Sequence, residues 1–215
     1  FEIFRNHLVV FERKNDLLGM HIMPWSGAGE HYLNFGEAAY AAFPGQNPEL
    51  DTSVFRYQYA SLTTPMSVYD YDMKSREKKL LKREEVGGGF DSGNYVTERL
   101  WAPAADGRKV PLSVVYRKGL RKNGGAPLYI YAYGSYGYST DATFNPMVVS
   151  LLDRGFVYAI AHIRGGEEMG RRWYEDGKLL AKKNTFTDFI AATEYLVKEK
   201  YANPKRVFAM GGSAG

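Results

Sequence analysis

The chain has 215 residues, of which 45% are hydrophobic and 24% are charged, and its formal net charge is +4. This composition is typical of a globular protein with one or two domains. The absence of cysteine excludes disulfides and thiolate metal sites and favours a reducing compartment, so we expect a cytoplasmic protein. No apolar run approaches the roughly 18 residues that cross a bilayer, so we expect no membrane partner.

The first 95 residues contain short stretches of alternating character broken by turn residues. Aromatic residues make up 15% of the chain, and flat rings suit the pleated, half-buried surface of a strand. Strands are predicted over 8–11, 54–59 and 67–71. Short strands at such spacing indicate an all-β sandwich or a segment of a propeller, and this length would make about two blades.

A basic cluster and a glycine run close this first part of the chain. The cluster within Lys78–Arg83 is followed directly by Glu84–Glu85. A nucleic-acid-binding face needs positive charge gathered on one side, so we predict a solvated strand edge and no nucleic-acid partner. Val86–Gly89 and Asp91–Gly93 are the predicted linker, because successive glycines cost backbone entropy inside a regular element.

Strands and helices are predicted to alternate over residues 96–215. Asp106-Gly107 is a turn dipeptide between two strands, and Asn145-Pro146 opens a helix that Gly155 ends. The predicted strands are 96–101, 112–116, 127–133, 157–163 and 206–210, and the predicted helices are 147–154 and 185–200. The crossover connections between strands indicate a parallel sheet with helices on its faces.

The helix predicted over 185–200 has the clearest periodicity. Thr185 and Asp188 are spaced like a capping box, and Asn203-Pro204 ends the helix. One stripe at helical spacing contains Phe186, Phe189, Ile190, Thr193, Leu196 and Val197. This stripe indicates an amphipathic helix.

Gly211–Gly215 fits the pattern G-x-S-x-G and follows a predicted strand of the α/β segment. In that setting the pattern predicts a nucleophile elbow, a tight strand-to-helix turn that exposes the hydroxyl of Ser213. Such a turn strains the backbone of the serine, and side chains at the two flanking glycines would clash. Ser213 is therefore the predicted nucleophile, and a plain glycine-rich turn before a helix is the alternative.

A serine hydroxyl needs a base that removes its proton. In α/β-hydrolases the acid and the histidine follow the serine along the chain, whereas all four histidines here precede Ser213. His162, in a predicted buried strand, is expected to be a core or strand-end histidine. We therefore expect the base and the acid to lie beyond residue 215, and residues 1–215 alone to be catalytically inactive.

The oxyanion hole is predicted to be built on two loops. One donor would be the backbone N–H of Ala214, the residue after the nucleophile. The second would come from the loop Tyr133–Gly137, at the carboxyl end of the strand predicted over 127–133. Open α/β sheets bind their ligands at that end.

Several motifs together resemble the prolyl oligopeptidase family of serine peptidases. They occur in that family's order and at similar spacing: Tyr131–Gly137, Ile163–Glu167 and Gly211–Gly215. Three further segments are similar to the oligopeptidase B branch of the family: Leu62–Pro65, Tyr174–Lys178 and Lys183–Phe186. The resemblance runs along the whole chain.

This resemblance implies a seven-bladed β-propeller that covers an α/β-hydrolase domain. Residues 1–95 would be the last blades and residues 96–215 the N-terminal half of the catalytic domain, so the chain would be an internal piece of a longer enzyme. The hydroxyl of Tyr133 would be the second oxyanion donor, with a core aromatic as the alternative. The implied substrates are short peptides cut after Lys or Arg, and no metal or cofactor is implied.

Other interpretations stay open. A prolyl oligopeptidase would cut after proline, although its elbow usually carries Asn where this chain has Ala214. A carboxylesterase or lipase shares the elbow but lacks a propeller, and a truncated, non-catalytic fragment is a further alternative. Arg164 is expected to form a structural ion pair rather than to act in catalysis.

Overall fold

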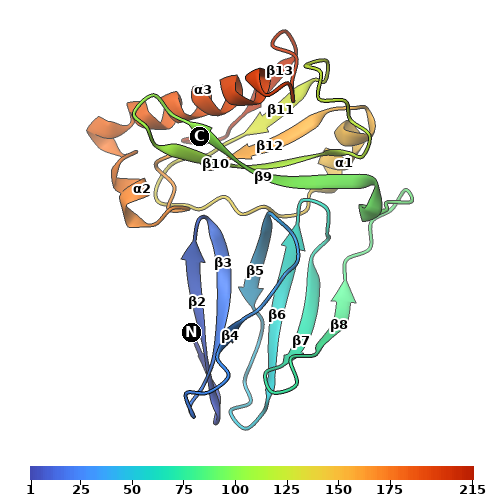
Figure 1. Ribbon diagram of the computed structural model, residues 1–215, viewed down its shortest axis with the longest axis vertical. Coiled ribbons are helices and arrows are strands. Elements are labelled where there is room, and N and C mark those ends of the chain that lie inside the picture. Colours follow the sequence, from blue (N-terminus) through green and yellow to red (C-terminus); the bar gives the residue numbers. More distant parts are fainter.

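The computed structural model describes all residues from Phe1 to Gly215 and contains three β-sheets. Two antiparallel four-stranded sheets stand side by side in one half of the molecule, and a mixed sheet with its helices lies against their ends (Figure 1). The first sheet has the order β1 (Glu2–Ile3), β2 (His7–Lys14), β3 (Leu17–Pro24), β4 (His31–Tyr32). The second has the order β5 (Tyr40–Pro44), β6 (Val54–Ser61), β7 (Ser67–Asp72), β8 (Lys78–Arg83).

Alternation of side chains explains how these two sheets pack. Along β6, Phe55, Tyr57 and Tyr59 are buried, whereas Val54 and Arg56 point to solvent. The buried rings form one core with side chains of the first sheet, including Phe4, Val9, Met20 and Ile22. The predicted strands over 8–11, 54–59 and 67–71 are confirmed as parts of β2, β6 and β7.

The basic cluster lies on β8, the edge strand of the second sheet. All six residues of Lys78–Arg83 are exposed to solvent, as expected for a solvated strand edge. The chain then passes through a turn in which Gly88 and Gly89 both have positive φ, through the short 3-10 helix η1 (Ser92–Asn94), and into the third sheet. The predicted linker therefore contains no strand and only one turn of helix.

The third sheet has the order β13-β11-β12-β10-β9. Its centre is parallel, because β11 pairs in parallel with both β12 and β13, whereas the β9–β10 hairpin is antiparallel and β10 is antiparallel to β12. The hairpin turns at Asp106-Gly107, as predicted, and Gly107 has a φ of +81°. The bounds are β9 Tyr95–Pro103, β10 Lys109–Arg117, β11 Leu128–Tyr131, β12 Val157–Ala161 and β13 Val207–Met210.

Helices cover both faces of this sheet. On one face, Ala192 and Leu196 of α3 (Lys183–Lys198) join a core with Leu112, Leu128 and Ile130. On the other, α1 (Pro146–Asp153) packs through its buried Val148 and Leu152. Asn145 caps α1, because its side chain accepts a hydrogen bond from the N–H of Met147. The helix predicted from the Asn-Pro pair is therefore confirmed.

Two details of the helix prediction are wrong. Helix α3 begins at Lys183, and Thr185 and Asp188 form no capping box, because both are buried and bond to the loop after β12. The predicted stripe does not pack as a unit, since Phe186 and Ile190 are more than half exposed. The buried side of α3 contains Thr185, Asp188, Ala192 and Leu196.

Two short helical segments between β12 and α3 carry no signal in the sequence. They are α2 (Arg171–Glu175) and the 3-10 turn η2 (Leu179–Ala181). Both lie in the loop region at the carboxyl end of β12. None of the helices has the length and apolar character that crossing a membrane requires.

Candidate active site

The glycine-rich segment after β13 forms a sharp turn that exposes Ser213. Ser213 has a φ of +55°, a region that residues other than glycine seldom occupy. The N–H of Gly215 donates to the carbonyl of Gly212 across 2.8 Å and closes the turn. Backbone strain of this kind at a nucleophile is the geometry expected of the elbow.

Both flanking glycines are required by space. A Cβ on Gly211 would lie 2.7 Å from the carbonyl carbon of Gly215, and one on Gly215 would lie 2.9 Å from the Cα of Tyr133. The second contact also locates the turn, because it packs directly on the backbone of the loop after β11. The turn and the loop are adjacent since their strands pair in parallel, with Tyr131 opposite Met210.

Tyr133 and the turn share one cavity. It has a volume of about 330 Å³ and is lined mainly by apolar side chains, together with Tyr133, Ala214 and Gly215. The exposed side chains of Phe186 and Ile190 of α3 form part of its wall. The ring of Tyr133 is half-buried and stands edge-on to Tyr138, with the ring centres 5.7 Å apart. The structure thus brings two of the three predicted site residues, Tyr133 and Ala214, to the wall of one cavity, and Ser213 lies in the turn beside it.

A side chain that was not singled out from the sequence connects the two loops. The hydroxyl of Ser135, which is buried, donates a 3.0 Å hydrogen bond to the carbonyl of Ala214. Ser135 lies within the motif Tyr131–Gly137, so its position in the sequence was visible. Its partner, the carbonyl of Ala214, could not be predicted, because the contact depends on how β11 and β13 pair.

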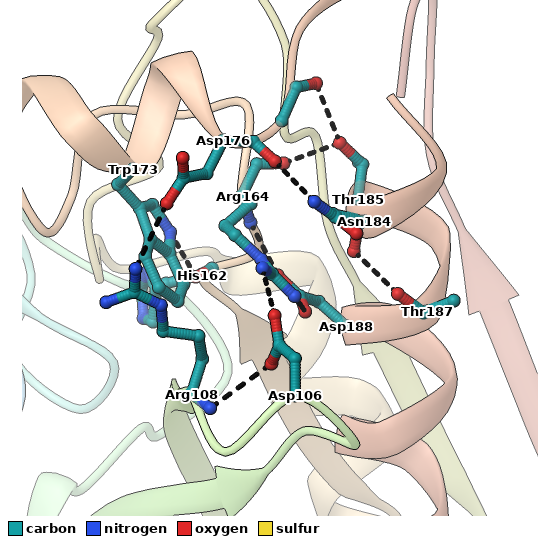
Figure 2. Close-up of polar contacts among 11 residues, drawn as sticks. Asp106, Arg108, His162, Arg164, Trp173, Asp176, Asn184, Thr185, Thr187 and Asp188 are labelled. Carbon is teal, nitrogen blue, oxygen red and sulfur yellow. Dashed lines mark hydrogen bonds and ion pairs between the residues drawn. The ribbon is translucent and has the colours of Figure 1, made fainter. Parts of the chain in front are cut away.

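Arg164 forms the structural ion pair that was expected, at the start of the loop after β12 (Figure 2). Its buried guanidinium donates to Asp188 of α3 through Nε at 2.8 Å and Nη2 at 2.6 Å, and to Asp106 through Nη1 at 2.6 Å. The backbone N–H of Arg164 also donates to Asp188. Hydrogen bonding to Asp188 raises the pKa of Arg164 further above its ordinary value.

This ion pair fixes the loop against which the Tyr133 loop packs. The hydroxyl of Thr185 donates to the carbonyl of Arg164 at 2.7 Å, and the carbonyl of Gly177 lies 3.2 Å from the same oxygen (Figure 2). A Cβ on Gly165 would lie 2.0 Å from the carbonyl oxygen of Gly134, so the two loops touch through backbone. The N–H of Gly137 donates to the carbonyl of Gly165 across 2.9 Å. Arg164 therefore acts on the site through packing, not through contact with a substrate.

His162 is buried and has no contact with the Ser213 turn. Its Nε2 lies 2.8 Å from the hydroxyl of Ser113 and 3.3 Å from the carboxylate of Asp16. Burial lowers the pKa of His162 well below its ordinary value. These contacts agree with the expected core histidine.

Two comparisons with family models cover most of the chain. The model of the prolyl oligopeptidase family matches residues 142–215. The model of the prolyl oligopeptidase N-terminal β-propeller domain matches residues 1–84. The chain belongs to the prolyl oligopeptidase family. The four-stranded sheets β1–β4 and β5–β8 accordingly belong to the β-propeller part, and the segment from α1 to β13 belongs to the α/β-hydrolase part.

Individual members of the prolyl oligopeptidase family match along the whole chain. Dipeptidyl aminopeptidase BI of Pseudoxanthomonas mexicana is 53% identical over 100% of the chain, and Protease 2 of Moraxella lacunata is 40% identical over 99% of it. The closed form of oligopeptidase B from Trypanosoma brucei with covalently bound antipain superposes with a TM-score of 0.89 at 40% identity, over 99% of the chain. The chain spans 30% of the length of these two curated relatives and 31% of that solved structure.

Proposed function

We propose that these residues belong to a serine peptidase that hydrolyses short peptides through an acyl-enzyme, with Ser213 as the nucleophile. The observation that carries the proposal is the positive φ of Ser213 in a turn that follows a parallel strand. Membership of a peptidase family supports it. The division into propeller blades over residues 1–95 and a catalytic half-domain over 96–215 is part of the same proposal.

In this mechanism the hydroxyl oxygen of Ser213 attacks the carbonyl carbon of the substrate. A histidine that follows the serine along the chain takes its proton and then gives that proton to the leaving amine, and water later releases the acyl group. The N–H of Ala214 and the hydroxyl of Tyr133 would donate to the oxyanion that forms in between. Both residues line the cavity beside the turn.

For the substrate we propose short peptides cut after Lys or Arg. The 40% identity to an oligopeptidase B supports this preference over cleavage after proline, since a prolyl endopeptidase structure that superposes almost equally well is 34% identical. Propeller blades across one side of the catalytic fold would admit short peptides and exclude folded proteins. We also propose a cytoplasmic location, because the chain has no cysteine.

A second candidate is the release of dipeptides from the N-terminus of a peptide. It rests on one observation, the 53% identity to a protein named as a dipeptidyl aminopeptidase. The two candidates share the nucleophile and the oxyanion donors and differ only in which peptide bond reaches Ser213. N-terminally blocked and free substrates that end in the same arginine amide would distinguish them.

The test is active-site labelling of the full-length protein with a fluorophosphonate, a reagent that phosphonylates activated serines. We expect one label, on Ser213, and none in Ser213→Ala. Blocked arginyl, blocked prolyl and free dipeptidyl substrates then report specificity, with the arginyl substrate expected to have the highest kcat/KM. Full activity of Ser213→Ala would overturn the nucleophile assignment.

A further inference from the structure

Lys182 reaches into the candidate active site from the junction between η2 and α3. Its ammonium donates a 2.8 Å hydrogen bond to the carbonyl of Gly134 and a second one to the hydroxyl of Ser135. Both partners belong to the loop that carries Tyr133. Lys182 is half-buried, and burial lowers its pKa. A partly desolvated ammonium is costly unless it is hydrogen-bonded, so these two acceptors hold the Lys182 side chain in place.

The contact continues to the nucleophile turn. The Ser135 hydroxyl accepts from Lys182 and donates in turn to the carbonyl of Ala214 at 3.0 Å. Three segments far apart in the sequence are therefore joined in one directed line of hydrogen bonds. The line ends on the residue whose N–H would be the first oxyanion donor.

We propose that Lys182, acting through Ser135, is a positioning residue that sets the geometry of the oxyanion hole. This inference rests on the function proposed above. The hole is built on two loops, so its geometry depends on the distance between the Tyr133 hydroxyl and the Ala214 N–H. The Lys182–Ser135 bridge ties the Gly134–Ser135 backbone to the carbonyl of Ala214, which is joined to the N–H of the same residue through its Cα, and so restrains that spacing.

The environment of Gly134 shows why the loop depends on such a contact. Gly134 has a φ of +63°, and a Cβ there would lie 2.5 Å from Ile163 and 2.8 Å from Thr185. Its carbonyl is pressed against Gly165 on one side and meets the Lys182 ammonium on the other. Without the lysine, the carbonyl would lose its only side-chain donor in a crowded position, and the loop would be free to shift.

The position of Lys182 at the helix start does not explain its orientation. Its side chain makes no cap hydrogen bond to α3. A cation gains nothing from the N-terminal end of a helix, where the dipole favours negative charge. The ammonium also lies 5.8 Å from the ring of Phe186, a residue of the cavity wall. The hydrogen bonds of Lys182 are thus with the Gly134–Ser135 loop, and its contact with α3 is the ring of Phe186.

The test is a double-mutant cycle with Lys182→Met and Ser135→Ala in the full-length protein. Each variant should lower kcat by about tenfold to a hundredfold, because a misplacement of about 1 Å at a catalytic site can cost on the order of 10² in rate, with KM changed less than threefold. The double variant should be no worse than the worse single variant, because both changes break one bridge. Additive losses in kcat would overturn the proposal.

A peptide aldehyde provides a readout that a merely structural role would not change. Its hemiacetal oxygen occupies the oxyanion hole, so its inhibition constant should rise in Lys182→Met in parallel with the loss in kcat. The matched control is Lys183→Met, which removes the same charge from the neighbouring exposed residue and should leave both quantities unchanged. Should Lys182→Met fail to fold, Ser135→Ala alone decides by the same two measurements.

The two proposals fail in different ways. If the fluorophosphonate does not label wild-type Ser213, the peptidase assignment fails first. If wild-type Ser213 is labelled and Lys182→Met keeps wild-type kcat and aldehyde affinity, the peptidase assignment holds and the role of Lys182 is wrong.

Discussion

The carboxylate of Asp16 and the imidazole of His162 lie 3.3 Å apart, measured from Oδ2 to Nε2, in the interior of the molecule. Asp16 is at the tip of the β2–β3 turn, and this tip touches the mixed sheet (Figure 1). Arg99 of β9 pairs with the same carboxylate and also donates to the carbonyl of Asn15 at 3.0 Å. Burial raises the pKa of Asp16 and lowers that of Arg99, and their mutual attraction opposes both shifts. A propeller blade thus inserts one acid among the buried polar groups of the hydrolase part.

Asp16→Asn should destabilise the protein strongly. The change leaves the Arg99 guanidinium, whose side chain is only 10% exposed, without its charged partner. Breaking a buried pair in this way typically costs about 3–5 kcal/mol in the free energy of unfolding. Urea unfolding of the full-length protein measures that loss, and hydrogen exchange should accelerate at the β2–β3 turn and along β9.

The matched control for this change is Asp51→Asn. Asp51 pairs with Arg5, but both side chains are more than 60% exposed. Such a pair contributes about 0–1 kcal/mol. Equal losses from the two substitutions would show that the β2–β3 tip is not held by its buried charge.

Glu168 should make the free energy of unfolding decrease as the pH rises from about 4.5 to 8. Burial raises the pKa of Glu168 to about 8, opposed by a hydrogen bond that its carboxylate accepts from the N–H of Thr140. An unfolded glutamate has a pKa near 4.3. Between these values the folded protein keeps a proton that the unfolded chain has released, so the stability that Glu168 contributes at low pH is lost as the pH rises.

Glu168→Gln should remove this dependence, because the amide keeps the shape of the carboxyl and cannot ionise. We expect similar unfolding free energies for variant and wild type near pH 4.5, and an excess for the variant on the order of a few kcal/mol at pH 9. Glu167→Gln, at the half-exposed neighbouring position, is the control and should leave the pH dependence as in wild type. Parallel curves for Glu168→Gln and wild type would contradict the prediction.

Most of the fold could be predicted from local sequence. The five strands of the mixed sheet and α1 follow from apolar runs, a turn dipeptide and an Asn-Pro cap, all of which are short-range signals. The face of α3 was not predictable in this way, because Asp188 is buried only since Arg164 approaches from another segment. Helix α2 has five residues and no apolar stripe to mark it.

In the candidate site too, residues in local motifs were predictable, whereas residues with long-range contacts were not. Ser213 was predicted from a local motif whose glycines the backbone requires, and the role of Tyr133 was predicted from the resemblance to the family. Ser135 and Lys182 contact partners far along the chain, and these hydrogen bonds exist only once the loops have met. Spacing alone carries no information about such contacts.

The two acids that bind Arg164 should differ in what their removal costs. Asp188 is fully buried and accepts three hydrogen bonds from Arg164, whereas Asp106 is 47% exposed and accepts one. Asp188→Asn should lower the free energy of unfolding by about 3–5 kcal/mol, and Asp106→Asn by about 1 kcal/mol or less. Thermal and urea unfolding of both variants measure the difference. Both acids bind the same arginine. Equal losses of unfolding free energy in the two variants would therefore mean that burial of the acid does not determine the strength of its ion pair with Arg164.

Tyr133→Phe tests the second oxyanion donor. The substitution removes one hydroxyl and keeps the ring that stands edge-on to Tyr138, so the fold should be retained. Loss of one oxyanion donor typically lowers turnover by about 10²–10³, and the loss should fall on kcat, since the hydroxyl would meet the oxyanion only as the transition state forms. Tyr138→Phe removes a hydroxyl from the neighbouring exposed ring and should leave kcat unchanged. A wild-type kcat in Tyr133→Phe would show that Tyr133 only packs in the loop and does not donate to the oxyanion. The N–H of Ala214 would then be the one remaining donor of this proposal.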